Sequence, residues 1–148
     1  MKPTYLWGRV LAGAIAVYHI IFGLALLFSG ELAIRLARLL AGLTVEGTPQ
    51  MGVVGEIFGC YLLAFGLMMV FVVVDPVKNR SMISVALTLF VLRVVQRVVF
   101  ASKTMAILGL SAAAYWPMAL VVGAFALALA LFRVRIAGDQ KRLAGSAA

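Results

Sequence analysis

Residues 52–74 read GVVGEIFGCYLLAFGLMMVFVVV, an apolar stretch long enough to cross the hydrocarbon core of a bilayer as one helix. Its carboxylate is Glu56 and its thiol is Cys60. The glycines of this stretch share an arc of about 60° on a helix with about 3.6 residues per turn. A stripe without side chains lets a second backbone approach closely. We therefore expect a helix-packing face made by Gly52, Gly55, Gly59 and Gly66.

Glu56 lies at the edge of this glycine stripe, so we expect it to face protein rather than lipid. The next apolar stretch carries Arg93, Gln96 and Arg97 within an arc of about 100°, which gives that helix one polar face. A buried carboxylate needs a partner. The sequence therefore predicts an intramembrane polar cluster of these four residues, in which Glu56 pairs with one of the two arginines.

Two arginines within one membrane span carry more positive charge than a single acid can neutralise. One interpretation is structural: the second arginine extends to the interface or caps backbone carbonyls. The other is functional: Arg93 and Arg97 hold an anion, which would be a lipid phosphate, a carboxylate or a quinone oxygen.

The composition places the whole chain, residues 1–148, in one integral membrane domain. Hydrophobic residues make up 65% of the sequence, and the mean hydropathy is +1.13, whereas soluble domains are near half apolar. A net charge of +8 would favour nucleic-acid binding in a soluble chain. Basic cytoplasmic loops and anionic lipids explain that charge here, so we expect membrane lipids and no nucleic acid as partners.

The hydropathy pattern predicts an all-α polytopic membrane protein, a bundle of four transmembrane helices. The spans are expected over residues 6–28, 52–74, 81–101 and 113–132, with a loop or surface segment at 102–112 and a basic cytoplasmic tail at 133–148. The first span is too long and lacks the cleavage signal for a secretory leader, so we expect it to be retained. In the last span, Ala119 and Gly123 contribute a small-residue packing face.

Residues 30–43 are too few to span a bilayer and predict a short interfacial helix between the first two spans. Glu31, Arg35 and Arg38 recur at spacings of four and three, which places them on one polar face, while leucines cover the remainder. Glu31 and Arg35 are spaced to form an ion pair along this helix.

The distribution of basic residues predicts the orientation. The two ends of the chain and the turn at 75–80 carry more lysine and arginine than the two connections on the opposite side. The positive-inside rule then places both termini in the cytoplasm of a bacterial-type inner membrane, and the interfacial helix on the outer face.

His19, the single histidine, lies near the middle of the first span, and counting from the helix ends puts Arg93 at a similar depth. It can hydrogen-bond across helices, act as an axial ligand to a haem iron or a chlorophyll-type magnesium, or transfer protons. A metal site of His19, Glu56 and Cys60 is disfavoured because it has three ligands on two helices beside an arginine. We expect no metal, no cofactor and no catalytic residues, because no nucleophile–base set is present.

The second span resembles that of DoxX-like four-helix membrane proteins. The resemblance rests on Glu56, Gly59, Leu62, Leu63 and Gly66, and more loosely on Arg9, Gly13 and Gly23 in the first span. It covers about the first half of the chain and does not include the stretch from 93 to 97. It implies an accessory subunit near a quinone-linked oxidoreductase.

These observations favour a non-catalytic accessory or scaffold subunit of a larger inner-membrane, electron-transfer complex. Its expected partners are lipids and either other membrane subunits or further copies of the chain. The alternatives are a small transporter or channel that uses Glu56, Arg93 and Arg97, and a pigment- or haem-binding subunit that uses His19.

Overall fold

A computed structural model describes residues 5–41 and 48–145, and over these ranges it is all-α, as the sequence predicts. The helices, in chain order, are α1 (Leu6–Phe28), α2 (Gly30–Ala41), α3 (Pro49–Val74), α4 (Arg80–Val99), α5 (Ala101–Leu108) and α6 (Ala112–Gly145). Four of them, α1, α3, α4 and α6, are long and apolar enough to cross a membrane. Within lipid, a single apolar segment can satisfy its own backbone hydrogen bonds by forming an α-helix.

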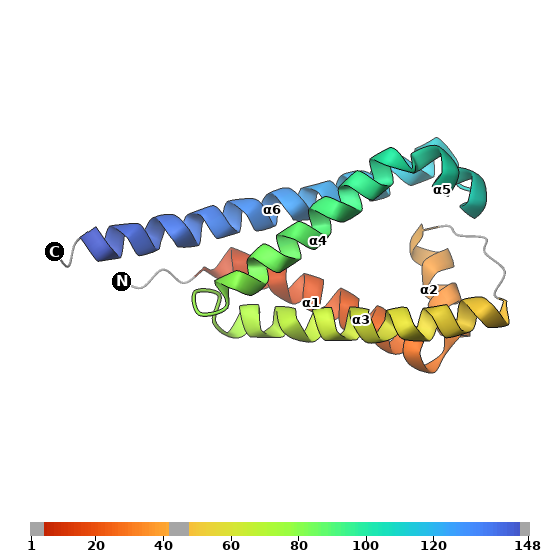
Figure 1. The fold of residues 1–148 in the computed structure, drawn as a ribbon, viewed down its shortest axis with the longest axis horizontal. Helices are drawn as coiled ribbons and strands as arrows, with labels where there is room; N and C mark the ends of the chain where they lie inside the picture. The colour runs from red at the N-terminus through yellow and green to blue at the C-terminus, as the bar shows by residue number, and fades with distance from the viewer. Residues whose placement is uncertain (1–4, 42–47, 146–148) are drawn as a thin grey trace.

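The first helix pair, α1 with α3, is packed through glycine (Figure 1). A Cβ atom added to Gly23 would lie 2.7 Å from the backbone nitrogen of Leu63 and 2.9 Å from the carbonyl oxygen of Gly59. A Cβ atom on Gly66 would lie 3.0 Å from the backbone nitrogen of Ile20. The two backbones are thus in direct contact, which only residues without a side chain permit.

The glycine stripe of α3 contributes unequally to this contact. Gly59 and Gly66 are buried against α1, and Gly55 faces Leu26, whose Cδ2 would lie 3.4 Å from an added Cβ atom. Gly52 has nothing within 4 Å and is exposed. The predicted packing face therefore extends over about three turns and ends before Gly52.

The second helix pair is α4 with α6, which lie side by side in opposite directions (Figure 1). The rings of Phe90 and Phe125 pack with centroids 5.8 Å apart, and Arg133 donates from Nε to Ser84 Oγ over 2.7 Å. The two pairs meet at the end where α1 begins, and diverge toward the end that carries α2 and α5 (Figure 1). Where the pairs meet, the core contains Ile15, Met69, Ile83, Leu129 and Phe132, all almost completely buried.

A capped turn joins α3 to α4. Asp75 Oδ1 accepts hydrogen bonds from the backbone nitrogens of Val77 and Lys78, over 3.0 and 2.9 Å. Asn79 Nδ2 donates to the carbonyl oxygens of Phe71 and Asp75, which also accept from the backbone nitrogens of Asp75 and Asn79. The turn is fixed by its own polar side chains, and it connects the two helix pairs.

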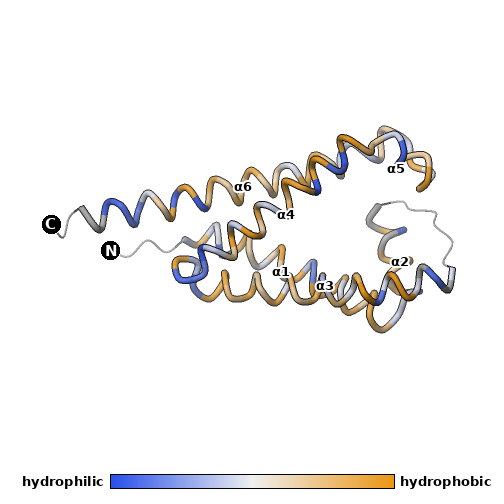
Figure 2. Tube along the Cα trace, viewed as in Figure 1, coloured by the Kyte–Doolittle hydropathy of each residue, from blue (hydrophilic) through white to orange (hydrophobic). Residues whose placement is uncertain are grey.

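The last helix departs from the prediction of a span followed by a tail. Helix α6 has 34 residues, about 51 Å at 1.5 Å per residue, whereas a hydrocarbon core is about 30 Å thick. Its excess length is the basic segment after Phe132, which continues as helix (Figure 2). Ile136 is buried there, and Arg80 of α4 donates to Gln140, so packing against α4 and α1 holds this segment helical.

The two short helices lie at the diverging end (Figure 1). Helix α2 is amphipathic where the sequence predicts it, with Arg35 Nη2 2.6 Å from Glu31 Oε1; the last residues of the predicted 30–43 range lie outside the described residues. Most of the segment predicted as a loop or surface segment at 102–112 is instead helix α5, which ends at Gly109 in the left-handed conformation (φ 62°).

Candidate functional site

The site begins with His19, which the middle of α1 places inside the protein. Its side chain is 1% exposed. The ring packs against Phe65 of α3 and Phe90 of α4, with centroids 4.6 and 6.2 Å away. An imidazole in such an apolar shell needs hydrogen-bond partners for both nitrogens.

Both nitrogens of His19 have partners, and these fix its protonation. Nδ1 lies 2.7 Å from the carbonyl oxygen of Ile15, which can only accept, so Nδ1 carries a proton. Nε2 lies 3.1 Å from Nη1 of Arg93. Because a guanidinium only donates, Nε2 is the acceptor and carries no proton. His19 is thus a neutral imidazole and brings no charge to the site.

Arg93 is the second member of the site and joins the two helix pairs. It reaches from α4 to His19 on α1, and its Cζ lies 5.7 Å from the centroid of the Phe90 ring. Tyr18 and Arg97 are the other ionisable groups close to it. An arginine at this depth costs about 3 kcal/mol on insertion scales, and a neutral histidine offsets only part of that cost.

Arg97 lies one turn along α4 from Arg93, on the same face. Its Cζ is 5.8 Å from the ring centroid of Tyr115, and the Tyr115 hydroxyl donates to the backbone oxygen of Arg97 over 2.7 Å. Tyr115 is fully buried near the start of α6, beside Trp116. The guanidinium of Arg97 therefore sits at the level of an aromatic pair typical of a membrane interface.

Glu56 does not join this cluster, so the predicted ion pair with Arg93 or Arg97 is wrong. Among the described residues the pair formed by Glu31 and Arg35 is the only carboxylate–guanidinium contact, and Glu56 is exposed. The reason is geometric. Nine residues at about 100° each separate Glu56 from Phe65, the residue of α3 that faces His19, so the two point to opposite sides of the helix.

The remaining predicted polar residues also lie apart from the site. Gln96 is exposed on α4, and Cys60 is a free, exposed thiol on α3. No group of three or more histidine, cysteine, aspartate or glutamate side chains within the described part of the chain could hold a metal ion. Since Nε2 of His19 accepts from Arg93, axial ligation of a haem or a chlorophyll-type pigment would require displacing that arginine.

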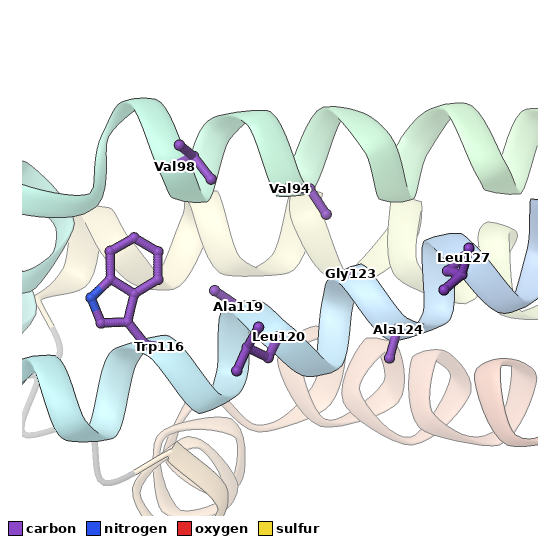
Figure 3. A pocket seen from close by; sticks show the side chains of 8 residues that line it. All are labelled: Val94, Val98, Trp116, Ala119, Leu120, Gly123, Ala124 and Leu127. Atoms are coloured by element: carbon purple, nitrogen blue, oxygen red, sulfur yellow. The ribbon is translucent and has the colours of Figure 1, made fainter.

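Ala119 and Gly123, predicted to pack helices, line a groove on α4 and α6 instead. The groove has a volume of about 280 Å³ and a mainly apolar wall (Figure 3). A Cβ atom added to Gly123 would have nothing within 4 Å. The wall consists of Val94, Val98, Trp116, Ala119, Leu120, Gly123, Ala124 and Leu127.

Sequence reasoning did not identify Tyr115 as a member of the site. The sequence did carry a signal. Arg97 lies near the end of α4 and Tyr115 near the start of α6, so both residues lie at the same end of an antiparallel helix pair. Phe65 and Phe90, which the sequence analysis also did not single out, pack against the His19 ring.

The fold and the site define a class: a multi-pass, all-α membrane protein with four long apolar helices and an internal histidine–arginine contact. Comparison with protein-family models, curated proteins and solved structures found no match to this chain.

Proposed function

We propose that this chain is a non-catalytic accessory subunit of a larger inner-membrane complex, with both termini in the cytoplasm, which binds lipids and packs against other membrane subunits. The resemblance of its second span to DoxX-like proteins is the reason to place that complex near electron transfer. The transporter alternative is not favoured, because Glu56 and the two arginines do not meet within one copy of the chain.

The observation that carries this proposal is the exposed carboxylate of Glu56. Among the described residues it has neither an ion pair nor a hydrogen bond. It lies inside an apolar span, about one turn from the start of the run 52–74. A polar group on the outer surface of a membrane helix is costly unless something outside the chain supplies its partner. A donor on a neighbouring membrane helix supplies it here.

The native cysteine offers a direct test. Cys60 is exposed four residues from Glu56, about 40° around the helix, so a probe on its thiol samples the same face. A photoactivatable maleimide on Cys60, activated in native membranes, should join this chain to one membrane protein in fixed stoichiometry. An adduct of two copies would identify a homo-oligomer, and a different chain would identify a mixed complex.

Substitution of the acid supplies the control. Glu56→Leu removes the acceptor but leaves a surface suited to lipid, so we expect it to fold and to lose the adduct. Tyr61→Leu, which changes another exposed residue of α3, should keep it. A wild-type chain that runs as a monodisperse monomer in mild detergent, and whose probe reacts with lipid only, would refute the proposal.

A further inference from the structure

The guanidinium groups of Arg93 and Arg97 are incompletely used by the protein. Each carries five N–H donors. One donor of Arg93 goes to His19 Nε2, and the side chain of Arg97 makes no hydrogen bond within the described residues. No fully buried nitrogen or oxygen of a described side chain lacks a partner, and Arg93 and Arg97 are both half-buried, so the nitrogens of the unused donors retain some accessible surface.

The charge of the two arginines is also uncompensated. No carboxylate of the described chain approaches either guanidinium within 4.0 Å, and the imidazole that contacts Arg93 is neutral. The two residues are four apart on one helical face, about 6 Å along the axis. Two adjacent cations with free donors form a site for one anion that has several acceptor oxygens.

We infer that Arg93 and Arg97 bind a phosphate oxyanion, supplied by a lipid headgroup or by free phosphate. A phosphate presents oxygens in tetrahedral directions and can accept from both guanidiniums, whereas a carboxylate pairs in one plane with a single fork. Arg97 lies two residues before the end of α4, level with Tyr115 near the start of α6, so the site is within reach of headgroups at the interface.

His19 acts in this site as a positioning residue. Its unprotonated Nε2 holds Nη1 of Arg93 and leaves the opposite edge of the guanidinium for the anion. Tyr115 does the same for Arg97 by a different route, because its hydroxyl fixes the backbone and its ring lies near the guanidinium. This inference deepens the lipid-binding part of the proposed function and rests on the chain lying in a membrane.

The test uses the delipidated full-length chain in a nonionic detergent, with three probes: phosphatidylglycerol, diacylglycerol with the same acyl chains, and inorganic phosphate. Native mass spectrometry counts bound lipid, and the shift of the thermal unfolding midpoint reports binding of each probe. We expect phosphatidylglycerol to bind and to raise the midpoint, and diacylglycerol to do neither. Inorganic phosphate that also binds, and competes, would identify the free anion as a ligand; phosphate that does not bind would leave the lipid headgroup as the source.

The informative variant is Arg97→Gln. The bond from Tyr115 ends on the backbone oxygen of this residue, so the substitution keeps it. We expect affinity for phosphatidylglycerol to fall about tenfold or more. The matched control Arg35→Gln removes the same charge from exposed α2 and should change affinity by less than about twofold.

Three results would overturn the inference: equal binding of diacylglycerol and phosphatidylglycerol, equal affinity in the two variants, or a wild type that binds neither phosphatidylglycerol nor phosphate. None of these depends on a protein partner. A wild-type chain that is monomeric in detergent and whose Cys60 probe reacts with lipid only would refute the accessory-subunit proposal. Loss of lipid binding through Arg97→Gln in that same chain would still support this site.

Discussion

Gly23→Ala is the substitution for which the structure gives the clearest magnitude. The added methyl group would lie 2.7 Å from the Leu63 nitrogen and 2.9 Å from the Gly59 oxygen, and both are backbone atoms that no rotamer change can move. Ordinary contact begins at 3.4 Å. Helices α1 and α3 must therefore separate locally by about 0.7 Å, the distance needed to remove the closest overlap.

Separation of the pair costs stability because α1 and α3 lose close contacts along their shared face. Overpacking of this kind costs about 1–3 kcal/mol, while alanine gains up to about 1 kcal/mol over glycine in helix propensity. With the full propensity gain, the net loss is expected to be up to about 2 kcal/mol. Gly123→Ala is the matched control, since its methyl group meets nothing within 4 Å and only the propensity gain remains.

The assay is reversible unfolding in mixed micelles, followed by far-UV circular dichroism, with the wild type and both variants at one detergent composition. The difference between the two variants removes the propensity term and should be about 1–3 kcal/mol. Equal stability of Gly23→Ala and Gly123→Ala would refute direct backbone contact between α1 and α3.

Three further outcomes follow from the polar contacts. His19→Leu leaves Arg93 without its acceptor and should lower the free energy of unfolding by about 1–3 kcal/mol in the same assay. Tyr115→Phe removes the bond to the Arg97 oxygen and should cost about 0.5–1.5 kcal/mol; a loss well above about 1.5 kcal/mol would contradict a single hydrogen bond between neutral groups. Burial is the larger cause that raises the pKa of Tyr5, and a neighbouring carboxylate raises it further, so the folded state favours the protonated phenol. The protonated Tyr5 phenol should make its full contribution to the free energy of unfolding below the ordinary tyrosine pKa of about 10. This contribution should be lost as the pH rises through the folded-state pKa. Absorbance titration should therefore show a late-ionising tyrosine component that Tyr5→Phe removes.

The helix boundaries could be predicted because lipid imposes them. Runs of about twenty apolar residues must form helices there, and α1, α3 and α4 begin and end within three residues of the predicted spans. The extension of α6 was not predictable in the same way. Residues 133–145 are rich in charge and small side chains, and they are helical here through tertiary contacts such as the buried Ile136.

The sequence predicted the depth of the site residues along the helices, but not which side of its helix faces each neighbour. Counting from the helix ends places His19 and Arg93 at one level, and they are in contact. The expectation that Glu56 faces protein from the edge of the glycine stripe was wrong, because its side chain is exposed. The residue pattern of a single helix does not show which neighbouring helix covers each of its sides. In the structure, α1 packs on the glycine stripe of α3, and α4 lies near Phe65. Glu56 is covered by neither helix and is exposed.

The contact between a charged Arg93 and a neutral His19 is the central feature of this account, and ¹⁵N NMR of the ring nitrogens measures it directly. Since the chain has one histidine, selective histidine labelling yields a single, unambiguous pair of resonances. We predict a protonated Nδ1 and an unprotonated Nε2 at neutral pH, unchanged in Glu56→Leu and shifted at Nε2 in Arg93→Gln. A protonated Nε2, or an imidazolium with protons on both nitrogens, would contradict a neutral His19 that accepts a hydrogen bond from Arg93.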